Sequence, residues 1–287
     1  MEILINELSL HGQFNNIEEF INISLNKFIK IYSLLDIHNI QPLKKYNFYS
    51  ANITPNETFS LLLTLKDKNG VSDEVRKFKR IADKCINEPY WEIDIKHNPD
   101  DEFKWGDKIV SNTSLAEAYA RNSSLISFIP SSFNTDFIDI TSCNISKKIS
   151  NFYNSLELAK HLYDNKKITF QKYCNLIFKD SKLCFDKTNK SQSFDLINDI
   201  NDENEFLNSF HLFNDMTWSN ILSQSGKGKN KVGLAFEKYH NQNYFKNYFP
   251  LTEVYKFRCS QKFRAYGYRI GDIFHILEFD LTHKLSD

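Results

Sequence analysis

Apolar and polar positions alternate most regularly near the end of the chain, where they predict three consecutive strands. Residues 252–287 read TEVYKFRCSQKFRAYGYRIGDIFHILEFDLTHKLSD. A polar break and the Gly271-Asp272 pair divide this segment into three runs. A period of two places successive side chains on opposite faces of a strand. Because short turns join antiparallel neighbours, the segment predicts a small antiparallel sheet.

Upstream, the pattern predicts a mixture of helices and strands. Asn16 stands at the N-cap of a helix that should run to about Leu35, and Ser114 and Glu117 have the spacing of a capping box. Further strands are expected at residues 3–10, 61–65, 90–97, 124–129, 137–143 and 182–185. Further helices are expected at 73–86, 115–121, twice within 147–180, and at 205–213, 218–223 and 232–248. The fold class is therefore predicted to be α+β, with a mixed N-terminal region followed by helices and a C-terminal antiparallel sheet.

The polar segment 187–205, rich in Asn, Asp and Ser, predicts a domain boundary, although a long surface loop has the same composition. A chain of 287 residues is long enough for one large domain or two ordinary ones. We therefore expect an N-terminal region at 1–186 and a C-terminal region at 187–287.

Composition narrows the possible functions. Lys and Arg number 36 and Asp and Glu also number 36, so any nucleic-acid-binding surface must be local. The N-terminus lacks a signal-peptide pattern and no apolar run reaches the length of a membrane span, so we expect a cytoplasmic protein with no membrane contact. The cysteines are scattered without a Cys-x-x-Cys pair, which favours buried free thiols over a disulfide framework or a zinc site. No metal or other cofactor is expected. The cysteines are Cys85, Cys143, Cys174, Cys184 and Cys259.

The predicted terminal sheet interleaves basic and aromatic side chains. Such a sheet offers cations to phosphates and flat faces to bases, which is typical of nucleic-acid binding. The alternative is a solvated basic edge that only discourages pairing between sheets. The basic residues are Lys256, Arg258, Lys262, Arg264, Arg269, His283 and Lys284, with His275 among them.

These strands resemble the C-terminal sheet of RelE-type toxin ribonucleases, a small α+β fold shared with ParE-like and HigB-like proteins. In that family a Tyr-Lys-x-Arg/Lys strand precedes a Gly-Tyr-Arg strand, and an apolar strand then ends in a basic pair. The matching stretches here are 255–258, 267–269 and 274–279, with His283-Lys284 as the pair. A strand at 182–185 and the helices after it match the family order of strand, two helices and sheet. The resemblance covers at most about a third of the chain.

Two departures from the family pattern leave alternatives open. The segment between Tyr255 and Gly267 is longer than in the family, so either Lys256 with Arg258 or Lys262 with Arg264 occupies the catalytic strand. The residues after Lys284 contain no counterpart of the family's C-terminal tyrosine.

The resemblance implies metal-independent RNA cleavage. The ribose 2′-hydroxyl attacks the neighbouring phosphate, so a base must accept its proton and cations must stabilise the resulting anion. Histidine suits proton transfer near neutral pH, and arginine makes bidentate phosphate contacts. The predicted catalytic residues are Lys256, Arg269, His275, His283 and Lys284. The predicted nucleic-acid-binding residues are Arg258, Lys262, Arg264, Lys227, Lys229 and Lys231.

Three other patterns compete with this interpretation. Arg269-x5-His275 fits the spacing of HEPN-type ribonucleases, but that motif belongs on a helix and Gly271-Asp272 interrupts it. Residues 226–233 form a Gly/Lys loop that could bind phosphate but lack the Gly-Lys-Ser/Thr end of a P-loop.

The third pattern is a magnesium-dependent DNA nuclease site. Glu92, Asp94 and Lys96 would share a face of a strand at 90–97, with Asp73 or Asp83 as the partner acid. Glu102-Phe103-Lys104 matches the same pattern. The non-catalytic alternative is a solvent-exposed strand face on which opposite charges are paired.

The sequence therefore favours an RNA-binding or RNA-cleaving toxin or defence effector, whose partners are RNA or another nucleic acid and a protein such as an antitoxin. The alternative of a different class is a non-catalytic protein-interaction subunit of a larger assembly, for example an anti-phage one.

Overall fold

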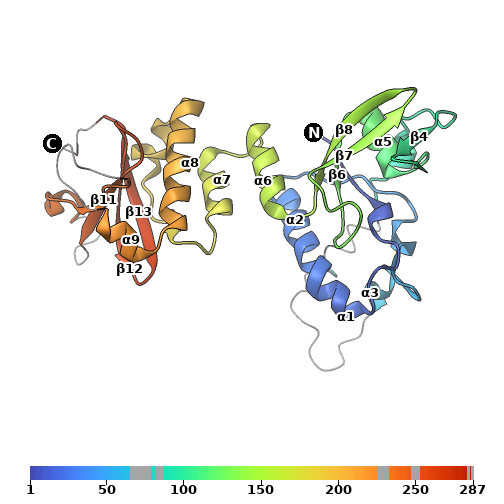
Figure 1. Ribbon diagram of the computed structural model, residues 1–287, viewed down its shortest axis with the longest axis horizontal. Helices are drawn as coiled ribbons and strands as arrows, with labels where there is room; N and C mark the ends of the chain where they lie inside the picture. The colour runs from blue at the N-terminus through green and yellow to red at the C-terminus, as the bar shows by residue number, and fades with distance from the viewer. Residues whose placement is uncertain are drawn as a thin grey trace. The chain divides into compact units, whose positions relative to one another are not determined.

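The computed structural model describes residues 1–64, 79, 81, 87–224, 233–246, 253–282 and 285. Contacts divide the chain into two compact units, the N-terminal unit Met1–His161 and the C-terminal unit Leu162–Asp287 (Figure 1). This division lies earlier than the boundary predicted at 186/187. The physical reason is that Phe170, Cys174 and Leu183 belong to the hydrophobic core of the C-terminal unit.

The N-terminal unit is built on a mixed sheet with the strand order β1-β6-β8-β7-β4-β5. β1, β6 and β8 are parallel, whereas β7 pairs antiparallel with β8 and β4, and β5 pairs antiparallel with β4. A separate small hairpin joins β2 and β3. The strands are β1 Ile3–Ile5, β2 Asn52–Thr54, β3 Glu57–Thr58, β4 Phe103–Trp105, β5 Lys108–Ile109, β6 Ser124–Ile126, β7 Phe137–Ser142 and β8 Ile145–Phe152.

The long helix of the N-terminal unit begins where the sequence predicts. The Asn16 side chain accepts a hydrogen bond from the Glu19 backbone N–H at 2.9 Å, and the helical segments that follow run without a break to Ile37. These segments are α1 Ile17–Phe20, a π-helical stretch Ile21–Leu25 and α2 Asn26–Ile37. The unit also contains α3 Leu61–Thr64, α5 Ser114–Arg121, the start of α6 Ser155–Asp164, and 3-10 turns at Glu7–Ser9, Phe48–Ser50 and Trp91–Asp94.

A polar ladder crosses the buried ends of the three parallel strands. The Asn6 side-chain amide donates to Ser127 Oγ at 2.9 Å, and Ser127 Oγ donates to Asn151 Oδ1 at 2.6 Å. All three side chains are buried, so each needs these partners to offset its lost hydration. An aromatic cluster packs around Phe128, which lies 4.5 Å from Phe28 and 5.9 Å from Phe20 between ring centroids.

The C-terminal unit contains the predicted antiparallel sheet. Its strand order is β10-β11-β12-β13-β9, antiparallel except that β9 runs parallel to β13. The three terminal strands confirm the alternation seen in the sequence. The strands are β9 Leu183–Cys184, β10 Glu237–Lys238, β11 Val254–Arg258, β12 Arg264–Ile270 and β13 Ile273–Asp280.

Helices cover one face of this sheet. Figure 1 shows α8 lying along the sheet with α7 beside it. Phe206, Phe210 and Phe213 of α8 are fully buried in the core that this packing creates. A smaller apolar cluster that includes Tyr266 and Tyr268 lies on the other face. The helices are α7 Phe170–Ile177, α8 Ile200–Asp215 and α9 Trp218–Ser223, with 3-10 turns at Lys190–Gln192, Phe194–Leu196 and Gln242–Phe245.

Several predicted elements differ from the structure. Residues 61–64 are helical, because a short apolar run does not distinguish a strand from a helix. The helix predicted at 232–248 is wrong for the described residues, which form β10 and a 3-10 turn. The beginning of the helical pattern predicted within 147–180 is instead β8, which runs to Phe152. The helix predicted at 73–86 lies almost entirely outside the described residues.

The strand predicted at 90–97 is also wrong. Its alternating apolar residues do not make a buried face, since Trp91 is 2% exposed but Ile93 is 66% exposed. The backbone N–H groups of Lys96 and His97 donate to the Glu117 carboxylate at 2.9 and 3.2 Å rather than to a neighbouring strand. Glu117 therefore does not close the predicted capping box, and Thr113 caps α5 instead.

Gly267 in β12 offers a test of the terminal sheet. A Cβ atom there would lie 2.2 Å from the His275 carbonyl oxygen and 2.7 Å from the Phe274 ring. Gly267→Ala should therefore lower the free energy of unfolding by roughly 1–3 kcal/mol, the range for overpacked cores. Urea unfolding followed by circular dichroism measures this.

The matched control is Gly271→Asn. Gly271 has φ +58°, a Cβ atom added there would have no neighbour within 4 Å, and asparagine tolerates this backbone conformation. The control should cost less than about 1 kcal/mol. Equal losses in the two variants would contradict the close approach of β12 and β13 at Gly267.

Candidate functional site

Arg269 lies on the helix-covered face of the terminal sheet. Its guanidinium carbon is 3.8 Å from the centroid of the Trp218 ring of α9. The Arg269 Nε–H donates to the Gly271 carbonyl at 2.6 Å, and a terminal nitrogen lies 3.6 Å from the Asp272 carboxylate. Arg269 is therefore partly occupied in stabilising the β12–β13 turn and in a cation–π contact.

His275 lies on the opposite face from Arg269. Its ring stacks on Tyr268, with centroids 4.9 Å apart and planes 13° apart. Tyr268 directly precedes Arg269 in β12, and adjacent residues of a strand point to opposite faces. Burial lowers the pKa of His275, and its Nδ1 is buried without a hydrogen-bond partner among the described residues. The imidazole is therefore neutral near pH 7, and Arg269 does not stand beside it.

Lys256 is a buried cation with partners of its own. Its side chain has 9% exposure, and its ammonium lies 3.5 Å from Glu237 Oε1 and 5.9 Å from the centroid of the Tyr239 ring. These contacts hold the ammonium against β10. The structure therefore does not gather Lys256, Arg269 and His275 around one reacting position. His283, Lys284, Lys227, Lys229 and Lys231 lie outside the described residues.

The β11–β12 hairpin brings the other three predicted cations together. Arg258 ends β11 and Arg264 begins β12, and the two are cross-strand partners in the sheet register. Lys262 is exposed in the turn between them. Directly paired residues of antiparallel strands project their side chains from the same face. Both arginines and the lysine therefore belong to one end of the sheet.

The two arginines form a pair of like charges that is only partly compensated, because Asp280 of β13 pairs with Arg264 in the sheet register and its charge raises the Arg264 pKa. Burial lowers the pKa of Arg264, and the charge of Arg258 lowers it further. The described residues include no ion pair between either guanidinium and a carboxylate. Arg264 donates to the Ser260 and Phe263 carbonyls at 2.9 and 2.8 Å, whereas Arg258 Nε is buried with no acceptor among the described residues. Like charges facing each other across a sheet are destabilising unless an anion joins them.

A shallow hollow lies beside Arg258. Its volume is about 340 Å³, and it is lined by Arg258, Ser260 and Gln261 from the hairpin and by Glu205 and Ser209 from α8. The Ser209 hydroxyl donates to the Arg258 carbonyl at 2.8 Å, which fixes the hairpin to the helix. A tetrahedral anion is small enough for this hollow, and Glu205 is the one carboxylate among its lining residues.

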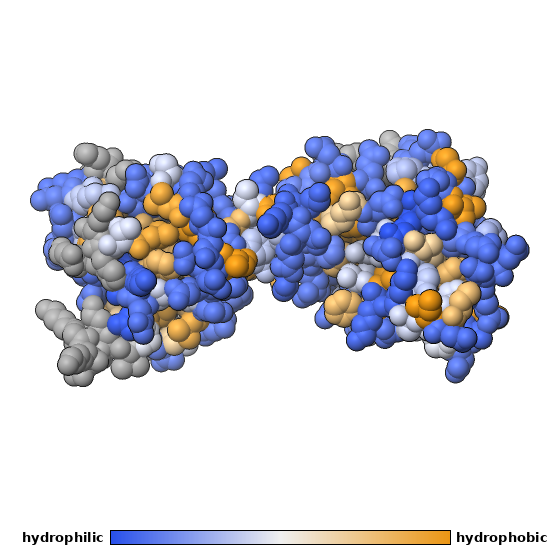
Figure 2. All heavy atoms as spheres, turned by 90° about the horizontal axis from the view of Figure 1, so that it is seen from above, coloured by the Kyte–Doolittle hydropathy of each residue, from blue (hydrophilic) through white to orange (hydrophobic). Residues whose placement is uncertain are grey.

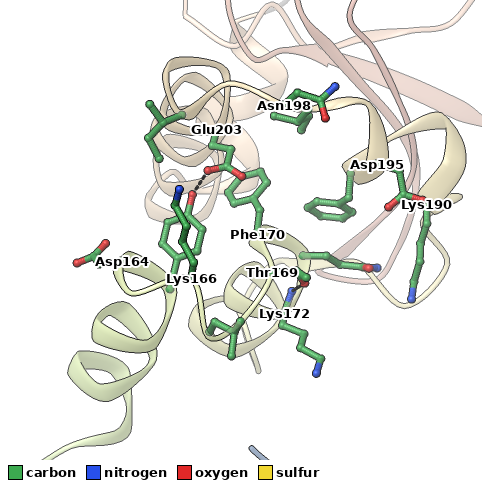
Figure 3. A pocket seen from close by; sticks show the side chains of 15 residues that line it. Asp164, Lys166, Thr169, Phe170, Lys172, Lys190, Asp195, Asn198 and Glu203 are labelled. Carbon is green, nitrogen blue, oxygen red and sulfur yellow. Dashed lines mark hydrogen bonds between the residues drawn. The ribbon is translucent and has the colours of Figure 1, made fainter. Parts of the chain in front are cut away.

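A larger cavity lies elsewhere in the C-terminal unit, at the beginnings of α7 and α8 (Figure 3). Its volume is about 940 Å³. The sequence pattern gave no sign of it, because the polar segment 187–205 that forms one wall has the composition of a boundary or loop. The lining residues are Tyr163, Asp164, Lys166, Ile168, Thr169, Phe170, Gln171, Lys172, Lys190, Phe194, Asp195, Ile197, Asn198, Ile200 and Glu203.

The residues predicted for a magnesium nuclease do not form that site. Asp94 and Lys96 are exposed and paired with each other at 2.7 Å, and Asp94 belongs to a 3-10 turn rather than a strand. The same-face geometry that the predicted strand required for Glu92, Asp94 and Lys96 is therefore missing. Among the described residues, no group of three or more His, Cys, Asp or Glu side chains is placed to hold a metal ion.

A buried ionic network holds the neighbouring part of the N-terminal unit. His97 Nδ1 lies 2.6 Å from Glu117 Oε2, and His97 Nε2 lies 3.2 Å from Asn112 Oδ1. The Glu117 carboxylate also accepts from Arg121 Nε. Both His97 and Glu117 side chains are fully buried, so this network orients α5 rather than contacting a substrate. His97 is thus a histidine with satisfied partners.

The cysteines, the hydrophobicity of the helices and the surface do not change the description of these sites. The four cysteines that the structure describes are free, and Cys143 is exposed, contrary to the expectation of buried thiols. None of the helices in the described part combines the length and hydrophobicity that a membrane span requires. On the face seen in Figure 2, hydrophilic side chains cover most of each unit and hydrophobic ones form separate patches.

The neutral state of His275 has a measurable pH dependence. Because burial lowers the folded-state pKa, the unfolded chain binds the proton first. The stability that this group contributes is therefore present above about pH 6.5, its usual pKa, and is lost as the pH falls from that value through the lower folded-state pKa. In His275→Gln, the free energy of unfolding measured with urea should depend less steeply on pH between about pH 5.5 and 7.5 than in the wild-type protein. An NMR titration placing the His275 pKa at or above its usual value would contradict this.

Comparisons with models of protein families, with curated proteins and with solved structures found no match. What the molecule does must therefore be inferred from its own residues and their geometry.

Proposed function

We propose that the C-terminal unit binds RNA through the β11–β12 hairpin. The observation that carries this proposal is the facing pair Arg258 and Arg264, whose like charges are offset only in part, by Asp280 across the sheet from Arg264. A folded chain keeps two guanidinium groups together at a cost in free energy, which a bound anion offsets. Guanidinium groups match phosphate with parallel hydrogen bonds, so the sugar–phosphate backbone is the fitting anion.

Neighbouring residues extend this phosphate site along the hairpin. Lys262 is exposed in the turn, and Gln261 and Ser260 line the hollow beside Arg258. Several cations along one edge suit a polyanion better than a single phosphate, because each neutralised phosphate releases bound counterions. The overall neutral composition is compatible with this, since the positive charge needed is local.

We propose RNA rather than DNA as the ligand because the terminal strands resemble those of RelE-type toxin ribonucleases. The resemblance predicts a strand, two helices and a sheet, and the described residues contain β9, α8, α9 and β10–β13 in this chain order. Binding is proposed without cleavage because Arg269 and His275 lie on opposite faces of the sheet and Lys256 is paired with Glu237. A toxin or defence effector of this kind would then act by binding RNA rather than by cleaving it.

Charge substitutions in the hairpin test this function. Arg258→Gln and Lys262→Ala should each weaken binding of a labelled single-stranded RNA roughly uniformly across sequences, by about 3- to 10-fold at low salt. Each should also reduce the salt slope of the binding constant by about 0.7, as expected for one lost phosphate contact on a single strand. Glu205→Gln should strengthen binding, because it removes the negative charge from the hollow. Fluorescence anisotropy from about 50 to 200 mM salt measures all three.

The matched control is Lys148→Ala, which removes one exposed positive charge from β8 of the N-terminal unit. The control should leave affinity and salt slope unchanged. The proposal fails if the wild-type protein does not bind RNA at about 50 mM salt, or if Lys148→Ala weakens binding as much as Arg258→Gln. Duplex DNA of the same length serves as the comparison ligand.

A further inference from the structure

We propose that the cavity at the beginnings of α7 and α8 binds a nucleoside monophosphate (Figure 3). Its volume of about 940 Å³ lies within the usual range of small-molecule sites, about 300–1,000 Å³. Such sites combine an apolar lining with a few placed polar groups. This cavity has both, and its residues are different from those of the β11–β12 hairpin.

Two phenylalanines form the apolar floor. Phe170 and Phe194 are 5% and 7% exposed, and their rings meet edge to face with centroids 5.6 Å apart. Ile168 and Ile197, both buried, continue this surface. A flat apolar wall of this kind suits an aromatic ring, and every nucleobase presents one.

A hydrogen-bonded pair fixes the wall beside this floor. The Tyr163 hydroxyl donates to Glu203 Oε2, and the Tyr163 ring stacks on Tyr173 with centroids 4.5 Å and planes 3° apart. Burial and the Glu203 carboxylate raise the pKa of Tyr163, so the phenol stays protonated and remains a donor. The Glu203 charge is thereby engaged, which lowers its repulsion of an anionic ligand. The site is preorganised on this side.

Unpaired cations supply the phosphate contacts. Lys166, Lys172 and Lys190 line the cavity and are exposed, and within the described residues their ammonium groups have no hydrogen bond or ion pair. Lys172 lies in the first turn of α7, where the backbone N–H groups add to the positive potential. Figure 3 shows Lys172 and Lys190 extending toward the same side of the cavity, where the phosphate would lie.

Acidic and amide groups at the rim limit the ligand to one phosphate. Asp164 and Asp195 also line the cavity, so a long run of phosphates would meet repulsion there. Carboxylates accept hydrogen bonds from ribose hydroxyls and base amino groups, and the amides of Asn198 and Gln171 both donate and accept. The donors and acceptors therefore match a nucleoside carrying a single phosphate better than a triphosphate or a simple anion.

Two sources supply this chemistry: a free mononucleotide, or the 5′-phosphorylated terminal nucleotide of an RNA strand. Either ligand places the base on the floor and the phosphate near Lys172 and Lys190. The proposal does not depend on RNA binding by the hairpin, because the two sites share no lining residue.

Isothermal titration calorimetry of the full chain with AMP, GMP, CMP and UMP tests the site. At least one should bind with a dissociation constant below about 1 mM, and the double variant Lys172→Glu/Lys190→Glu should weaken that binding by roughly 10-fold or more, the loss expected for charged hydrogen bonds. Asp195→Asn should tighten it. Lys179→Glu is the matched control, since Lys179 is exposed outside the cavity. Circular dichroism melting establishes that each variant is folded.

The proposal is overturned if no mononucleotide binds at about 1 mM, or if Lys172→Glu/Lys190→Glu behaves like Lys179→Glu in a folded protein. Competition then separates the two sources. Stronger displacement of the bound mononucleotide by a 5′-phosphorylated oligonucleotide than by its 5′-hydroxyl counterpart identifies a strand end, and equal weak displacement identifies a free nucleotide. The titration is repeated in Arg258→Gln, whose mononucleotide affinity should be unchanged. This control distinguishes ligand binding in the cavity from RNA binding by the β11–β12 hairpin.

Discussion

The packing of α8 against the terminal sheet is the interaction on which the C-terminal unit depends. Phe206 stacks on Phe263 at 5.3 Å, and Phe213 lies 4.7 Å from Phe257, so one helix packs on β11 and on the turn that leads into β12. Each fully buried phenylalanine contributes about 1.5–3 kcal/mol. Aromatic side chains fill the face of the sheet that packs against α8. Arg258 and Arg264, the two proposed phosphate contacts, lie at the end of the hairpin.

The same core also shapes the cavity at the beginnings of α7 and α8, which we propose as a nucleotide site. Phe194, one of the floor residues, packs against Phe279 of β13 with ring centroids 5.0 Å apart. The segment between β9 and α8 is therefore held to the sheet rather than free to move as a linker. Its anchoring places Lys190 and Asp195 opposite the first turn of α7. Both proposed anion sites thus depend on one hydrophobic core.

Strand geometry decides which of the terminal cations can act together. The composition of residues 252–287 suggested one catalytic cluster, but successive side chains of a strand point to opposite faces. Arg269 therefore joins Trp218 on the helix side, whereas Lys256 and His275 lie across the sheet. The paired cations Arg258 and Arg264 remain together because they are direct cross-strand neighbours. Among the described residues, Arg269 is therefore separated from Lys256 and His275 by the sheet.

Local signals in the sequence determined the α+β class, the cap at Asn16, the helix at Trp218–Ser223 and the three terminal strands. These depend on neighbouring residues, through alternation and side-chain capping. Long-range contacts decided the rest. The alternating run at 90–97 forms a 3-10 turn at Trp91–Asp94, and Glu117, distant in sequence, accepts the backbone N–H groups of Lys96 and His97 that follow it. The sequence pattern did not predict the cavity, because Tyr163, Phe194 and Glu203 come together only when α7 and α8 pack. The periodicity of apolar residues does not indicate which surfaces will face each other.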